Sequence, residues 1–189
     1  MSAAAEADVL AAFVRDHEPP PGRRLVRHYL RDLIYGANDG IITTFAVVTG
    51  VAGAALPART ALILGGANLL ADGFSMGASN FLAIRSDEAA RLAAGEDPAE
   101  PFPMRHGTAT LLAFVLAGSI PLLPYALAPA RLRLGAAVAA TLATLFVVGA
   151  ARSAVTRLRW WRAGAEMLVV GAVAAAVSYA VGVFLGGVM

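Results

Sequence analysis

The sequence contains no cysteine and no lysine, and only 15% of its 189 residues are charged. Without cysteine, a disulfide framework, a thiolate metal site and thiol catalysis are excluded. Because lysine is absent, the basic character of the chain (pI about 9.5) comes from arginine. Apolar residues dominate instead, at 58%, and the mean hydropathy is +0.67. A soluble domain this apolar would have too little polar surface, so the composition favours a membrane protein.

Apolar runs that are long enough to cross about 30 Å of hydrocarbon as helices occur five times. They are expected at 30–54, 60–85, 108–128, 134–156 and 164–187. The sequence therefore predicts an all-α integral membrane protein whose five transmembrane helices fill residues 29–188. Pro121 and Pro124 predict a kink or an early helix end within the third run. Residues 1–28 are expected to form a cytoplasmic arm with a short surface helix, and 86–106 a short acidic cytoplasmic loop.

The arginines between these runs predict the orientation of the chain in the membrane. Most of them fall in the N-terminal arm, between the second and third runs, or between the fourth and fifth. The opposite side holds only Arg59, Arg131 and Arg133. The positive-inside rule then places the N-terminus in the cytoplasm and the C-terminus outside. This distribution does not indicate a nucleic-acid surface, and the N-terminus does not read as a cleaved signal peptide. We expect a bacterial plasma membrane protein.

Polar side chains interrupt the first two runs at regular positions. Asp39 lies well inside the first, where a central Asp costs roughly 2.5–3.5 kcal/mol on insertion scales. In the second, residues four apart share one helical face; they are Asn68, Asp72, Met76 and Asn80. No arginine is expected at comparable depth, so a metal ion or a proton is the natural partner of these acids.

Helical rise predicts how deep these residues lie. Asp39 is about 12 Å along the axis from Arg31, and Met76 about 13.5 Å from Arg85, at about 1.5 Å per residue. Antiparallel neighbours would bring Asp39 and Met76 to one level. Oxygen ligands beside a thioether favour Fe²⁺ or a similar first-row ion over Mg²⁺. Weak binding would suit a conducting pathway. Nearer the cytoplasm we expect Asp32, Asn80 and Glu166, with Asp72 deeper.

Four segments together resemble the vacuolar iron transporter family. They are RDLIYGANDGIITTFAVVTGVAGA, LLADGFSMGASNFLAIRSD, LAGSIPLLPYAL and AEMLVVGAVAAAVSYAVG. The resemblance covers about residues 29–188. It implies a five-helix protomer, a homodimer with the ion path at the two-fold interface, and proton-coupled export of Fe²⁺, often with Mn²⁺, from the cytosol.

The resemblance also assigns roles to individual residues. It implies that Asp39 is the transport-path aspartate and Met76 its methionine. Asp32 matches an acid nearer the cytoplasmic entrance, and Glu166 the acid that opens the last span. Two departures stand out. Many members carry a long glutamate-rich cytoplasmic domain between the second and third spans, which is short here. Asn80 stands where several members have Glu, and Asp72 where they have a small residue.

The expected function is therefore transport of a divalent metal ion, with no enzymatic activity and no resident cofactor. One alternative is a proton-coupled carrier of another divalent cation or a small solute. A second is a metal-dependent membrane-embedded enzyme acting on lipid head groups, which would need several acids clustered near one interface. A purely structural membrane-assembly protein would leave Asp39 and Asp72 unexplained.

Overall fold

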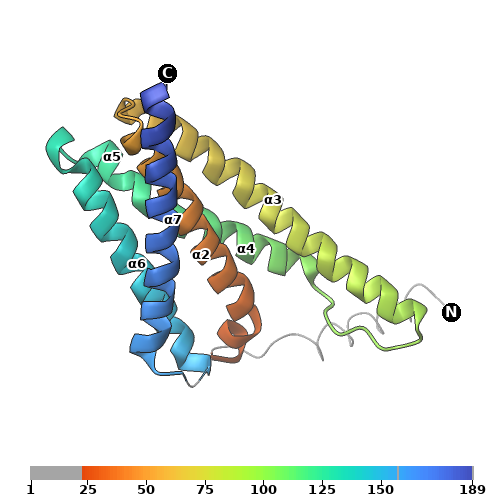
Figure 1. The fold of residues 1–189 in the computed structure, drawn as a ribbon. Helices are drawn as coiled ribbons and strands as arrows, with labels where there is room; N and C mark the ends of the chain where they lie inside the picture. Colours follow the sequence, from red (N-terminus) through yellow and green to blue (C-terminus); the bar gives the residue numbers. More distant parts are fainter. Residues whose placement is uncertain (1–22, 157, 189) are drawn as a thin grey trace.

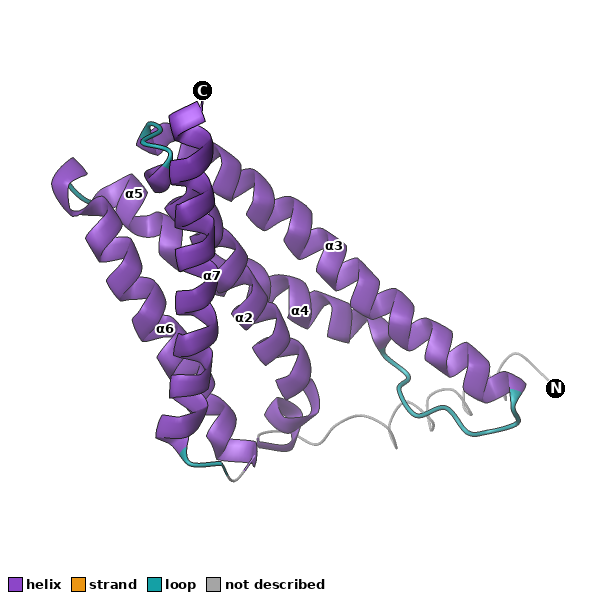
Figure 2. Cartoon of the chain, in the orientation of Figure 1, coloured by secondary structure: helices purple, strands orange, loops and turns teal. Residues whose placement is uncertain are grey.

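The computed structural model describes residues 23–156 and 158–188, so the surface helix expected in the N-terminal arm lies outside the described residues. The chain is helical throughout this part, with no strand among the described residues, and Figures 1 and 2 show one bundle of long helices. The all-α prediction is confirmed. The α-helices are α2 (Arg23–Gly53), α3 (Ala58–Ala93), α4 (Pro103–Gly118), α5 (Leu123–Leu127), α6 (Arg133–Thr156) and α7 (Trp160–Val188).

Helix α2 lies at the centre of the bundle and contacts α3, α4, α6 and α7 (Figure 1). Its enclosed position explains how it accommodates polar residues, because much of its surface faces protein and not lipid. Four other stretches are long and apolar enough to cross a membrane, and α2, with 31 residues, is long enough to be the fifth expected crossing. Those four stretches are Ala58–Ala93, Pro103–Leu127, Ala130–Ser153 and Trp160–Val188.

The first and last helices run in the same direction. Near the end of α2, a Cβ on Gly50 would lie 3.0 Å from the Ser178 hydroxyl. A Cβ on Gly186 would lie 2.8 Å from Ala54, just beyond that helix end. The ends of α2 and α7 therefore meet at one end of the bundle, as Figure 1 shows. Parallel first and last helices are what an odd number of crossings requires.

The third crossing is broken where the prolines predicted a break. Helix α4 ends at Gly118, a 3₁₀ turn spans Ile120–Leu122, and the short α5 follows. Proline supplies no backbone N–H, so the ladder of α-helical hydrogen bonds cannot continue through Pro121 and Pro124. The carbonyl of Ser119 instead accepts hydrogen bonds from the amides of Leu122 and Leu123. The predicted kink is confirmed.

Helix α3 continues well beyond the expected end of the second span at residue 85. It runs to Ala93, and α4 begins at Pro103. The coil between them is therefore shorter than the loop expected over 86–106. Arg91 holds this coil against the helix, because its guanidinium donates to the Asp97 carbonyl and pairs with Glu96 at 3.3 Å.

Glycines allow α2 and α4 to approach each other closely. A Cβ on Gly40 would collide with the backbone of Phe114, and one on Gly118 would fall 2.6 Å from the Gly40 carbonyl oxygen. Backbone atoms cannot move aside as a flexible side chain can. Small residues at such crossings are typical of membrane helices, where close van der Waals packing drives association.

We expect Gly40→Ala to lower the free energy of unfolding by about 1–3 kcal/mol, because the added methyl forces α2 and α4 apart. Thermal unfolding in detergent measures this as a lower Tm. Gly66→Ala is the matched control, since Gly66 is also helical and a Cβ there has nothing within 4 Å. Equal Tm values for the two variants would contradict the close contact.

Candidate functional site

A hydrogen-bonded network joins α2, α3 and α4 around the carboxylate of Asp32, which is only 3% exposed. Asn80 of α3 donates to Asp32 Oδ1 at 2.8 Å. Its amide also donates to the Thr110 hydroxyl at 2.8 Å. On the other side, His106 Nδ1 lies 2.5 Å from Asp32 Oδ2. The structure thus brings together Asp32 and Asn80, two of the residues predicted to lie near one end.

The network fixes the direction of its hydrogen bonds. An ionised carboxylate can only accept, so His106 Nδ1 carries a proton and donates it to Asp32. The Thr110 hydroxyl donates to the His106 carbonyl at 3.0 Å, which leaves its oxygen to accept from Asn80. Both carboxylate oxygens of Asp32 are therefore engaged, and three helices are held in one register.

The Asp32–Asn80 contact sets the relative depth of residues further along α2 and α3. Counting seven residues along each antiparallel helix from this contact brings Asp39 level with Gly73, one residue from Asp72. The two carboxylates are close enough to interact electrostatically. Met76 lies about one turn nearer the Asp32 end. The expectation that Asp39 and Met76 share one level is thus shifted by about a helical turn.

The reason for this shift is the length of α3. The expectation treated Arg31 and Arg85 as markers of one membrane boundary. Because α3 continues without a break to Ala93, Arg85 lies within a helix and does not mark its end. The side-chain contact between the helices is therefore a better guide to register than the flanking arginines.

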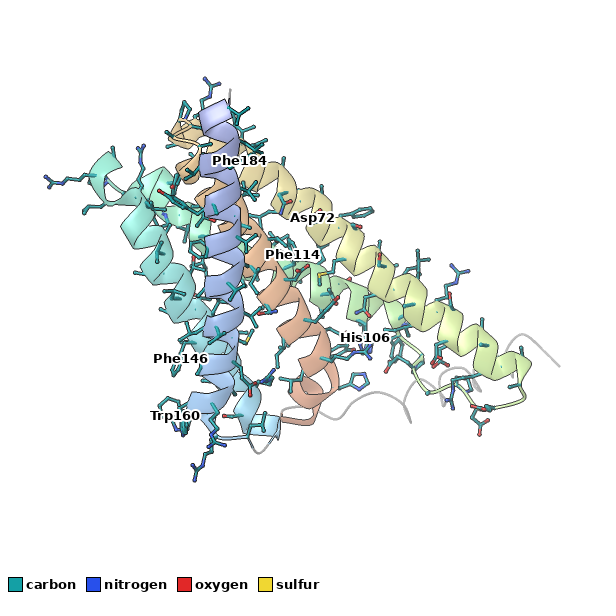
Figure 3. All side chains as sticks on the ribbon, in the orientation of Figure 1. Asp72, His106, Phe114, Phe146, Trp160 and Phe184 are labelled. Atoms are coloured by element: carbon teal, nitrogen blue, oxygen red, sulfur yellow. The ribbon has the colours of Figure 1, made fainter. Side chains whose placement is uncertain are left out.

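The polar residues inside the bundle differ in their exposure. Asp39 and Met76 are half-buried, and Met76 packs against the apolar cluster that contains Leu69 and Phe114. Asp72 is exposed in the protomer. Figure 3 shows Asp72 and Phe114 near the middle of the bundle, with His106 further towards one end. The acids therefore form a series along the bundle.

Glu166 lies apart from this series. Its carboxylate pairs with Arg152 of α6 at 2.5 Å, and its side chain is 62% exposed. The structure therefore places Glu166 at the α6–α7 pair and not in the Asp32 network. The two partners are fourteen residues apart but lie on different helices, joined by the turn between α6 and α7, so helical periodicity held no signal for this pair.

A cluster of side chains lies beside Asp32; Glu100 and His106 belong to the acidic loop expected over 86–106, but their convergence with His28 was not predicted. His28, Glu100 and His106 converge there, next to a cavity of about 630 Å³ that Asp32 and Asp87 also line. His28 and Asp32 are four residues apart and so share a face of α2. That spacing was the available signal, but it requires the helix to begin before residue 28, and α2 was expected to begin at residue 30.

Several buried polar atoms along α2 and α3 make no hydrogen bond within the described part of the chain. They include Asn38 Oδ1, Thr44 Oγ1 and Asn68 Nδ2. Each such atom costs about 1–3 kcal/mol when it is left without a partner. They lie within five residues of Asp39 or Asp72 in the sequence and add polar atoms to the same part of the two helices. Acids and amides inside an all-helical membrane bundle are typical of proteins that conduct ions or protons.

Comparison with known proteins agrees with this class. The model of the VIT family matches residues 30–99 and 88–183, and the two stretches overlap at the end of α3 and the coil that follows it. The chain belongs to the VIT family and is an integral membrane protein.

Several plant proteins are similar over most of their length. Vacuolar iron transporter homolog 5 of Oryza sativa subsp. japonica is 28% identical over 162 residues, which cover 80% of this chain and 78% of that protein. Vacuolar iron transporter homolog 1 of Arabidopsis thaliana is 29% identical over 167 residues, covering 84% of each. Vacuolar iron transporter 1 of Arabidopsis thaliana is 27% identical over 208 residues, covering 79% and 83%.

Proposed function

We propose that this protein exports Fe²⁺ from the cytosol, with Mn²⁺ as a second cargo, by proton antiport along a path at the interface of a homodimer. The observation that carries the proposal is the series of acids on α2 and α3, from the buried Asp32 network to the interacting pair Asp39 and Asp72. The similarity to proteins named vacuolar iron transporters supports the choice of metal.

The ligand chemistry supports a first-row dication. Asp39 and Asp72 offer carboxylate oxygens, and Met76 offers a thioether about one turn away. A thioether favours softer ions, whereas oxygens alone would suit Mg²⁺ or Ca²⁺. Buried orphan acceptors such as Asn38 Oδ1 would gain a partner when a hydrated ion passes. Weak ligands of this kind let the ion leave as well as enter.

The exposure of Asp72 supports a dimer. An acid facing lipid at the middle of a membrane helix is costly, so a second copy that covers this face would remove the penalty. Small exposed residues follow the adjacent face of α3 at intervals of four and would permit close approach of another helix; they are Ala67, Ala71, Ser75 and Ser79. A two-fold axis beside them would double every ligand of the path.

The orientation rests on the distribution of arginine. We place the Asp32 end of the bundle at the cytoplasm of a bacterial plasma membrane, with the C-terminus outside. Trp160 and Trp161 fit a membrane interface, because both rings are exposed beside arginines at the start of α7. Protons arriving from outside would compete with metal for the same carboxylates, and this competition would couple the two flows.

The test is metal flux into proteoliposomes that contain the purified protein, measured anaerobically with and without an imposed pH gradient. We expect Fe²⁺ flux that quickens when protons can move in the opposite direction. An Fe²⁺ flux that is the same with and without the pH gradient would refute antiport. Competition with other divalent ions identifies the cargo, and turnover of lipid head groups without flux would favour the enzymatic alternative.

We expect Met76→Leu to reduce the preference for Fe²⁺ and Mn²⁺ over Mg²⁺ by several-fold, because the variant keeps the volume of the side chain but removes its sulfur. The measurement is competition between these ions in the same flux assay. Met104→Leu is the control, since Met104 is 62% exposed at the start of α4. Unchanged selectivity in Met76→Leu would remove the thioether from the path.

A further inference from the structure

We propose that His28, Glu100 and His106 form a binding site for a first-row transition-metal ion, located at the mouth of the path. One ligand atom from each residue lies within 4.8 Å of the others. The site joins the start of α2, the coil before α4 and the first turn of α4. The existence of the site follows from this geometry, whereas its role in capturing cytosolic metal for export rests on the function proposed above.

The orientation of the His106 ring is the first argument for an ion. Its Nδ1 faces Asp32 Oδ2 at 2.5 Å, so its Nε2 points away from Asp32. Nε2 lies 3.2 Å from Glu100 Oε2. The ring therefore presents its second nitrogen to a carboxylate beside the cavity that both residues line.

Two imidazole nitrogens face the same carboxylate oxygen. His28 Nε2 and His106 Nε2 lie 3.1 and 3.2 Å from Glu100 Oε2. By hydrogen-bond geometry neither nitrogen has a partner among the described residues, although the Glu100 carboxylate interacts electrostatically with His106. The His106 side chain is only 7% exposed, so water does not freely replace the missing partner. The two nitrogens are short of a partner at a shared point.

Two of the three ligand-atom distances match those around a small ion. Bonds of about 2.1 Å to imidazole nitrogen or carboxylate oxygen place neighbouring ligand atoms about 3.0–3.4 Å apart. Both nitrogen–oxygen distances in the cluster fall in this range. The three ligand atoms lie within 4.8 Å of one another, which is wider than the roughly 4.2 Å that one such ion can bridge. The two histidine side chains would therefore move towards each other when an ion binds.

Groups outside the cluster hold its ligands in position. Asp32 orients the His106 ring through Nδ1, the arrangement that usually fixes a metal-binding histidine. Glu88, which is 9% exposed, accepts hydrogen bonds from the amides of Ala99 and Glu100 at 3.0 and 2.8 Å. The His106 ring and the backbone that carries Glu100 are therefore both held in place by neighbouring residues.

The donor set indicates which ions the site accepts. Two imidazoles and one carboxylate suit Fe²⁺, Co²⁺ or Zn²⁺, whereas Mg²⁺ and Ca²⁺ prefer oxygen alone. Three protein ligands leave coordination positions open for water, so the ion can exchange. The cavity of about 630 Å³ gives access from one side, and Asp32 and Asn80 connect the site to the α2–α3 path.

The experiment is a titration of the detergent-solubilised full chain with Co²⁺, followed by its visible absorption. We expect one ion per chain with bands typical of nitrogen and oxygen ligands, and no competition from equimolar Mg²⁺. His28→Ala and Glu100→Gln should each weaken binding at least about tenfold, and Asp32→Asn by about 10–100-fold through the ring it positions. Glu96→Gln, in the same coil but paired with Arg91, is the matched control.

Binding of Co²⁺ that is absent, or that is unchanged in the His28→Ala, Glu100→Gln double variant, would overturn the site and assign the cluster to a doubly protonated His106. Asp39→Asn separates the two proposals, because it loses a ligand of the path but should keep the Co²⁺ absorption of the His28–Glu100–His106 site. Binding without any Fe²⁺ flux in the unmodified protein would refute the proposed function and leave the site standing. Fe²⁺ flux without Co²⁺ binding at the cluster would overturn the site and leave the proposed function standing.

Discussion

Replacing Asp39 with asparagine is expected to reduce Fe²⁺ flux through the reconstituted protein by about a hundredfold. The variant keeps the shape and one oxygen of the side chain but removes its negative charge. A dication inside the bilayer depends on that charge to offset the water it has lost, and a rise of about 2.7 kcal/mol in the transport barrier corresponds to about a hundredfold in rate. Because Asp39 is half-buried and interacts with Asp72, its removal also eliminates a site for the coupled proton.

The measurement is initial Fe²⁺ flux into proteoliposomes under a pH gradient, normalised to the amount of inserted protein. Asp97→Asn serves as the control, since Asp97 is an exposed acid of the α3–α4 coil and should leave flux unchanged. The Tm of both variants should stay close to that of the unmodified protein. Normal flux through a folded Asp39→Asn variant would refute the role given to this residue.

Replacing Asp32 with alanine is expected to lower the free energy of unfolding by about 3–5 kcal/mol, the usual cost of removing one partner of a buried charged network. The truncation leaves Asn80 Nδ2 and His106 Nδ1 without their acceptor at the point where three helices meet. Asp32→Asn should be milder, because an amide oxygen still accepts from Asn80 and its N–H₂ can donate to the other tautomer of His106.

Chemical unfolding in detergent, followed by fluorescence of Trp160 and Trp161, measures this loss. Glu166→Ala is the comparison, because Glu166 is also a carboxylate with a cationic partner but is 62% exposed. An exposed pair contributes at most about 1 kcal/mol. Losses of equal size in the two variants would show that burial of the Asp32 network does not stabilise the bundle.

Most of the fold could be predicted from the hydropathy of the sequence and the positions of its prolines. The five crossings and the break at Pro121 and Pro124 were predictable because lipid demands long apolar helices and proline interrupts them. The helix ends were less predictable. Residues 86–93 include Asp87, Glu88 and Arg91, so they do not continue the apolar run, yet α3 continues through them. Helical structure outside the apolar run is stabilised by local pairs such as Arg91 with Glu96.

The candidate site was only partly predictable. The proximity of Asp32 and Asn80 follows from two antiparallel helices, and the structure confirms it. The level of Asp39 relative to Asp72 depends on a register that one sequence does not determine to within a turn. The convergence of His28 and Glu100 depends on the path of the coil before α4, which Glu88 holds through backbone amides. Such a contact has no periodic signature.

Close glycine contacts hold the two halves of α2 against different helices. The first half packs on α4 at Gly36 and Gly40. The second half packs on α7, where the Ser178 hydroxyl also donates to the Ala46 carbonyl. Because the two halves have different partners, a substitution in one contact is expected to weaken that end of α2 first, with local opening ahead of global unfolding.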